Sequence, residues 1–244
     1  MHLPSIIKEP AIHLIGDKCY TSLVENINIR DLECIKLLIS KGLGIGIVLF
    51  GSLIKIPQII KITTAGSVKG LSFESIALET IGYAIGLAYN NRQGNPFSTY
   101  GENLSLTIQD IFILLLILNY TGRIKELFIT GTIIMVLSYS LGSSWIINDT
   151  ILAFLQSLTI PISLASKIPQ IIKNHRNKST GQLSALATFG YTLGALARVF
   201  TTMTEVDDVI ILTGFTLASI FNLILTIQMI IYWDSDNSLL TKRD

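Results

Sequence analysis

The sequence predicts an all-α membrane protein with seven transmembrane helices, arranged as two parallel three-helix bundles joined by a linker helix (3+1+3). Three observations predict this fold: an apolar composition, apolar stretches that recur along the chain, and a motif that occurs twice. Of the 244 residues, 50% are hydrophobic and only 14% are charged, whereas soluble domains are about 25% charged. A membrane is therefore the expected solvent for most of this chain.

The apolar stretches are long enough to cross a bilayer. A hydrocarbon core of roughly 30 Å requires a helix of about 20 residues at ~1.5 Å per residue. The expected spans are roughly 33–57, 72–91, 103–121, 126–146, 149–172, 183–203 and 208–233.

Basic residues orient these spans, because cytoplasmic loops carry an excess of lysine and arginine. They concentrate in alternate connections and in the C-terminal tail. This places the N-terminus in the lumen and the C-terminus in the cytosol, as an odd number of spans requires. The expected divisions are a lumenal N-terminal segment (1–31), a first three-helix repeat (32–122), a linker helix (123–147), a second three-helix repeat (148–234) and a cytosolic tail (235–244).

The N-terminal segment contains no long apolar run, so no cleavable signal peptide is expected. The chain has two cysteines, Cys19 and Cys34, which are too few for a metal cluster. In an oxidising lumen they can form a disulfide, and two unpaired thiols remain the alternative.

A seven-residue motif defines the repeat. Lys55-Ile-Pro-Gln-Ile-Ile-Lys61 recurs identically 112 residues later as Lys167-Ile-Pro-Gln-Ile-Ile-Lys173. The same offset carries Asp110 onto Asn222 and extends the similarity over three helices. Since one linker helix separates the repeats, both run in the same direction and are related by an axis along the membrane normal.

The two Pro-Gln motifs resemble those of the PQ-loop proteins, whose fold is similar to that of the SWEET sugar transporters. Further segments resemble the mannose-phosphate-dolichol utilisation defect family over nearly the whole chain: Asp17-Lys-Cys-Tyr20, Leu38-Ile-Ser-Lys-Gly-Leu-Gly44, Gly70-Leu-Ser72, Ser179-Thr-Gly-Gln-Leu-Ser184, Leu196-Ala-Arg-Val-Phe200 and Tyr232-Trp233.

This resemblance implies a multi-pass protein of the endoplasmic reticulum membrane. Such a protein is required for dolichol-phosphate-mannose and dolichol-phosphate-glucose to serve as lumenal sugar donors. It would bind the lipid-linked sugar and present it or translocate it, in contact with membrane lipid and with lumenal glycosyltransferases. The resemblance implies neither catalysis nor a cofactor.

The motif residues suggest a hinge. Proline inside a helix removes a hydrogen bond and clashes with the preceding turn, so Pro57 and Pro169 should kink or end their helices near the cytosolic face. The amides of Gln58 and Gln170 can satisfy the freed backbone groups. A pair of moving hinges and a pair of static breaks both fit these residues.

Ionisable residues inside a membrane are costly, and they mark candidate functional sites. Lys41, Asp110 and Arg198 each lie roughly 8–12 Å from the lumenal ends of their spans at ~1.5 Å per residue. We expect an ion pair between Lys41 and Asp110. Arg198 then lacks an internal anion, which either the phosphate of a dolichol-linked sugar or the carboxylate of Glu102 can supply.

Two further residues complete the candidate ligand-binding set. Glu79 lies toward the cytosolic side, where it can pair with Lys55 or remain protonated. Asn222 is the repeat counterpart of Asp110. The first lysine of the second motif, Lys167, belongs to the candidate hinge with Lys55.

Other classes of function have little support in the sequence. The three histidines lie outside the spans, and no metal site, phosphate loop or nucleophile motif occurs. A net charge of +1 gives no electrostatic footprint for nucleic acid. Two alternatives to lipid-sugar handling remain open: a SWEET-like small-solute transporter, and a scaffold or chaperone for glycosyltransferases.

Overall fold

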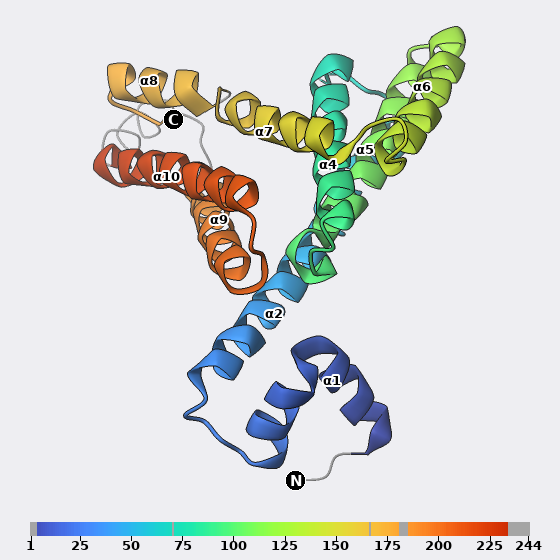
Figure 1. The fold of residues 1–244 in the computed structure, drawn as a ribbon. Helices are drawn as coiled ribbons and strands as arrows, with labels where there is room; N and C mark the ends of the chain where they lie inside the picture. The colour runs from blue at the N-terminus through green and yellow to red at the C-terminus, as the bar shows by residue number, and fades with distance from the viewer. Residues whose placement is uncertain (1–3, 70, 166, 181–184, 234–244) are drawn as a thin grey trace.

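The computed structural model describes residues 4–69, 71–165, 167–180 and 185–233. Every regular element in these ranges is a helix (Figure 1). The elements are α1 (Ser5–Tyr20), η1 (Thr21–Glu25), α2 (Leu32–Gly51), α3 (Ile56–Ala65), α4 (Phe73–Arg92), η2 (Phe97–Thr99), α5 (Gly101–Tyr120), α6 (Ile124–Gly142), α7 (Asp149–Ala165), α8 (Lys167–Asn177), α9 (Ala185–Glu205) and α10 (Val209–Ile231).

Five helical segments are long and apolar enough to cross a membrane: Leu32–Ala65, Gly101–Tyr120, Ile124–Gly142, Asp149–Asn177 and Val209–Ile231. The expected spans at 72–91 and 183–203 are also helices, α4 and α9, of 20 and 21 residues. Both are more polar than the other five. The structure therefore supports an all-helical membrane protein, and the count of seven spans stays a prediction. The predicted tail at 235–244 lies outside the described residues.

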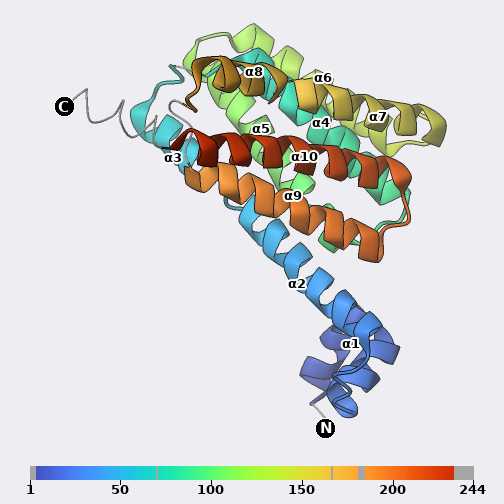
Figure 2. The ribbon, with the colours of Figure 1, turned by 90° about the vertical axis from the view of Figure 1, so that its left-hand side faces the viewer.

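The N-terminal segment folds against the start of α2 (Figure 2). Cys19 and Cys34 form a disulfide, which decides between the two alternatives that the sequence left open. The side chain of Tyr20 is fully buried beside this bridge. Hydrogen bonds from Ser22 Oγ (2.6 Å) and the Cys34 N–H (3.2 Å) lower the pKa of Asp31, which caps α2.

The first motif sits at a break between helices. Helix α2 ends at Gly51, and α3 begins at Ile56 with Pro57 in its first turn. The helix is interrupted just before Pro57, as expected of a proline whose ring would clash with a continuing preceding turn, and movement at this break stays a prediction. In a first turn proline costs little, since its missing N–H would have no intrahelical partner.

The repeat is visible in the helix boundaries. The 112-residue offset carries the last residue of α3, Ala65, onto the last residue of α8, Asn177. It also carries the first residue of α4, Phe73, onto the first residue of α9, Ala185. We call residues 32–122 the first half and residues 148–233 the second half.

Within each half the same helices pack together. Helix α4 packs along α5 in the first half, and α9 packs along α10 in the second. Between the halves α2 packs against α9, and α4 packs against α7. These two inter-half interfaces correspond to each other under the repeat. Helix α6 packs on α4 and α5 and exposes most of its apolar side chains, as expected for a surface that faces lipid.

Candidate functional site

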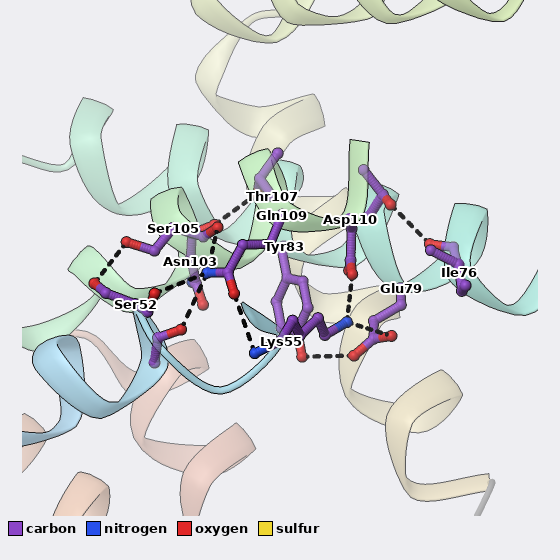
Figure 3. Close-up of polar contacts among 12 residues, drawn as sticks. Ser52, Lys55, Ile76, Glu79, Tyr83, Asn103, Ser105, Thr107, Gln109 and Asp110 are labelled. Carbon is purple, nitrogen blue, oxygen red and sulfur yellow. Dashed lines mark hydrogen bonds and ion pairs between the residues drawn. The ribbon is translucent and has the colours of Figure 1, made fainter. Parts of the chain in front are cut away.

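Three charged side chains form the first-half cluster: Lys55, Glu79 and Asp110 (Figure 3). Lys55 Nζ lies 2.9 Å from a Glu79 carboxylate oxygen and forms a second ion pair with Asp110. The Asp110 side chain is fully buried. The Tyr83 hydroxyl donates to Glu79 Oε1 at 2.8 Å, and the Tyr83 ring centroid lies 5.6 Å from Lys55 Nζ. Of the two possibilities for Glu79, pairing with Lys55 is confirmed.

The predicted ion pair between Lys41 and Asp110 is wrong. The break between α2 and α3 turns Lys55 toward the middle of α5, so Asp110 already has a cation. Lys41 pairs instead with Glu205 at the end of α9, and its Nζ atom lies 2.5 Å from Glu205 Oε2. Depth along a span could not reveal this pairing, because it depends on which helices become neighbours.

The helix break is held by a residue that the sequence analysis missed. The side chain of Gln109 accepts a hydrogen bond from the Lys55 N–H at 3.1 Å and donates to the carbonyls of Gly51 and Ser52 at 3.3 and 3.4 Å. Gln58 and Gln170, to which we assigned this role, make no side-chain hydrogen bond with the described residues. Only the packing of α5 against the break places an amide there.

The equivalent position in the second half has a different character. Lys167 Nζ donates to Asn222 Oδ1 at 2.5 Å, and we call these two residues the second-half pair. Asn222 Nδ2 donates to the carbonyl of Tyr191 at 3.1 Å. Under the repeat offset Tyr191 replaces Glu79 and Asn222 replaces Asp110. The second-half pair therefore has the lysine of the first-half cluster without either carboxylate.

Buried charges also join α2 and α5 of the first half to α9 of the second. Arg198 is paired with Glu102, and Lys41 is paired with Glu205. Ser98 connects the two pairs, since its carbonyl accepts from Arg198 Nη1 at 3.0 Å and its hydroxyl donates to Glu205 at 3.1 Å. These five residues form the inter-half network, whose four formal charges sum to zero.

The inter-half network decides between the two partners considered for Arg198. Glu102 neutralises the guanidinium, and both side chains are almost fully buried. A ligand phosphate was expected at Arg198 only if the guanidinium lacked an internal anion. That condition fails, so Arg198 is half of a structural ion pair.

A chamber of about 180 Å³ lies where α4, α5, α7 and α10 meet. Its lining contains amide and hydroxyl side chains but no charged residue: Asn90, Thr99, Asn103, Gln156, Thr159 and Ser163, with Gly86 and Gly214 among the remainder. The Gln156 Oε1 atom is buried without a hydrogen-bond partner. A chamber of this kind suits a small, neutral and hydroxyl-rich group.

The repeat explains why this space is open. The offset of 112 carries Gly86 onto Arg198 and Glu102 onto Gly214. An ion pair thus fills one inter-half interface, while two glycines occupy the corresponding place in the other. A Cβ atom at Gly86 would lie 3.0 Å from Asn103, and one at Gly214 would lie 3.3 Å from Ile160. Larger residues at these glycines would therefore reduce the chamber.

Metal binding has no support in the part of the chain that the structure describes. No group of three or more histidine, cysteine, aspartate or glutamate side chains is placed to hold an ion there. The charged residues that come together are instead paired with one another across helices. The chamber, the first-half cluster, the second-half pair and the inter-half network are the polar features on which function can rest.

Two related helical halves with polar groups between them define a class of polytopic membrane protein built by internal duplication. The chain belongs to the PQ-loop family: the PQ loop repeat matches residues 39–99 and 151–211, one copy in each half. It is also 31% identical over 182 residues to the human protein solute carrier family 66 member 3, a match that covers 73% of this chain and 87% of the relative.

Proposed function

We propose that this protein is a noncatalytic, seven-span protein of the endoplasmic reticulum membrane that handles dolichol-phosphate-linked mannose or glucose. The sugar enters the chamber between the halves, and the protein presents it or moves it to lumenal glycosyltransferases. The observation that carries this proposal is the lining of the chamber: amides and hydroxyls from both halves, with no charge. Such groups recognise sugar hydroxyls by direct hydrogen bonds.

The sequence supports the choice of sugar donor. The segments that resemble the mannose-phosphate-dolichol utilisation defect family include Leu196–Phe200, which contributes Arg198 to the inter-half network. With the N-terminus in the lumen, this network lies at the lumenal end of the bundle.

A second candidate is a carrier of a free small solute. The same uncharged chamber favours it, and so does the similarity to a relative named as a solute carrier. The two candidates differ in whether the recognised sugar carries a lipid. They share a chamber-dependent mechanism, whereas a scaffold for glycosyltransferases would not need the chamber.

Purified protein in liposomes distinguishes the candidates. The first measurement follows dolichol-phosphate-mannose with a radiolabelled sugar as its headgroup becomes accessible to impermeant periodate, which cleaves exposed vicinal diols. The second follows uptake of free radiolabelled mannose. Lipid-sugar handling predicts movement of the lipid headgroup without uptake of free sugar, and a solute carrier predicts the reverse.

Gln156→Leu tests the chamber itself, because Gln156 Oε1 has no partner to lose on substitution. We expect this variant to fold and to lose most activity in whichever assay is positive. Ser138→Leu, at an exposed residue of α6, is the control for exchange of a polar side chain. Equal activity of both variants, or no activity of the wild type in either assay, would favour the scaffold.

Location and orientation require their own test. Protease protection of terminal tags in sealed microsomes should protect an N-terminal tag and leave a C-terminal tag exposed. The opposite pattern would overturn the orientation that the basic residues predict. Co-fractionation with endoplasmic reticulum membranes tests the location.

A further inference from the structure

The lysines that open the two motifs have identical sequence surroundings and opposite electrostatic surroundings. Lys55 is held by two carboxylates, Glu79 and Asp110. Lys167 pairs with no carboxylate among the described residues, and its one polar partner there is the neutral Asn222. The first-half cluster therefore carries a formal charge of −1, and the second-half pair carries +1.

An ammonium ion in this position requires an anion. Lys167 is only partly exposed, and it lies in a helical segment apolar enough to span a membrane. The free energy of such a cation rises steeply as water is removed, and an amide oxygen compensates only part of that cost. In the first half the same cost is met by carboxylates. In the second half the chain provides none among its described residues.

Both residues of the second-half pair come four positions after a residue that lines the chamber. Ala218 lines the chamber from α10, and Asn222 lies one helical turn farther along the same helix, a rise of about 6 Å. Ser163 lines the chamber from α7, and Lys167 begins the following helix, α8. An anion bound by Lys167 would thus lie about one turn from a sugar in the chamber, which suits a phosphate attached directly to that sugar.

Asn222 can take part in binding this anion. Its Oδ1 accepts from Lys167, and its Nδ2 donates to the Tyr191 carbonyl. An amide nitrogen has two N–H groups, so one donor remains for a further acceptor. A phosphate oxygen beside Lys167 can accept from this donor and form a charge-assisted hydrogen bond with the ammonium.

We propose that Lys167 and Asn222 form the phosphate site for a sugar phosphate whose sugar occupies the chamber. This assignment deepens the proposed function and rests on it for the place of the sugar. It locates the phosphate at the unpaired lysine of the second motif and leaves Arg198 to its ion pair with Glu102. The same chemistry binds a lipid-linked and a free sugar phosphate.

The decisive variant transfers the first-half arrangement to the second half. Asn222→Asp gives Lys167 the carboxylate that Lys55 already has, which supplies an internal anion and repels a phosphate. We expect affinity for phosphate-bearing probes to fall by roughly tenfold or more, because the new carboxylate neutralises Lys167 and repels the anion. Thermal unfolding should move upward in the same variant.

Lys167 itself provides a graded series. Lys167→Gln should weaken phosphate binding to the same extent, and Lys167→Arg should retain most of it, because the positive charge remains. Asn119→Asp is the matched control, since it makes the same exchange of an amide for a carboxylate at an exposed residue near the end of α5. It should not change phosphate affinity.

Binding of four probes is measured by calorimetry or thermal shift. The probes are inorganic phosphate, mannose, mannose 1-phosphate, and dolichol-phosphate-mannose in nanodiscs. We expect only the phosphate-bearing probes to respond to Asn222→Asp. If only binding of dolichol-phosphate-mannose falls in Asn222→Asp, the ligand is a lipid headgroup. If binding of mannose 1-phosphate falls equally, the ligand is a free sugar phosphate.

The assignment is overturned if Asn222→Asp and Lys167→Gln both bind these probes as the wild type does, or if the wild type binds none of them. If Lys167→Gln fails to fold, Asn222→Asp decides alone, because it keeps the lysine and changes only its partner. The proposed function alone would fail if phosphate-bearing probes bound in a Lys167-dependent way while mannose did not bind and Gln156→Leu changed the binding of no probe.

Discussion

The two inter-half interfaces are related by the repeat, yet one is sealed and the other is hollow. Where α2 meets α9, the inter-half network fills the space with paired charges. Where α4 meets α7 and α10, glycines replace both members of one ion pair, and an uncharged chamber remains. A duplicated fold can therefore dedicate one interface to stability and leave the other available for a ligand.

The largest effect is expected from breaking the sealed interface. Glu102→Gln leaves the almost fully buried Arg198 guanidinium without its carboxylate. Removal of one partner from a buried ion pair costs roughly 3 to 5 kcal/mol. Chemical or thermal unfolding in detergent measures this loss.

A double variant sharpens the same test. Replacing Arg198 and Glu102 together by methionine and leucine removes both charges, and apolar replacement of a buried pair is often close to neutral. Stability should therefore recover most of what the single variant lost. A single variant as stable as the wild type would mean that the pair does not seal the interface.

A glycine on α2 gives the next largest effect. A Cβ at Gly44 would lie 2.5 Å from the Ser98 carbonyl oxygen, so Gly44→Ala must push apart the backbone at the sealed interface. Overpacking of this kind costs typically 1–3 kcal/mol. Gly46→Ala is the control two residues away, since a Cβ there meets nothing within 4 Å. Comparable melting temperatures for the two variants would contradict the close approach.

The hollow interface should respond in the opposite direction. Gln156→Leu removes a buried oxygen that has no hydrogen-bond partner, so unfolding should become more costly by about 1 kcal/mol. The same variant should lose sugar binding. This separation of stability from binding is what distinguishes a ligand chamber from a packing defect, and thermal shift with and without mannose measures both. A loss of stability would argue against it.

The smallest effect is expected at the second chamber glycine. Gly214→Ala places a methyl group 3.3 Å from the Ile160 side chain, which is tight but flexible. The gain in helix propensity of up to about 1 kcal/mol offsets the crowding. The melting temperature should change little, and a change as large as that of Gly44→Ala would mean that this interface is as tightly packed as the sealed one.

Much of the fold follows from the sequence because its signals are local. Apolar length indicated the helices, and exact recurrence of Lys55–Lys61 as Lys167–Lys173 indicated the duplication. The pairing of Lys55 with Glu79 was also within reach, because both were expected on the same side of the membrane. Gln109 was not, since nothing in its local sequence marks it as the partner of a helix break.

The sequence by itself determined the membrane class, the helical halves and three candidate buried charges: Lys41, Asp110 and Arg198. Only the tertiary structure decided their partners. Lys41 pairs with Glu205 and not with Asp110, and Arg198 pairs with Glu102 and not with an external anion. Ion pairs form between side chains that are neighbours in space, whatever their distance along the chain. The chamber likewise depends on where Gly86 and Gly214 meet across two halves. A cavity is formed by residues from several segments, so no single stretch of sequence can predict it.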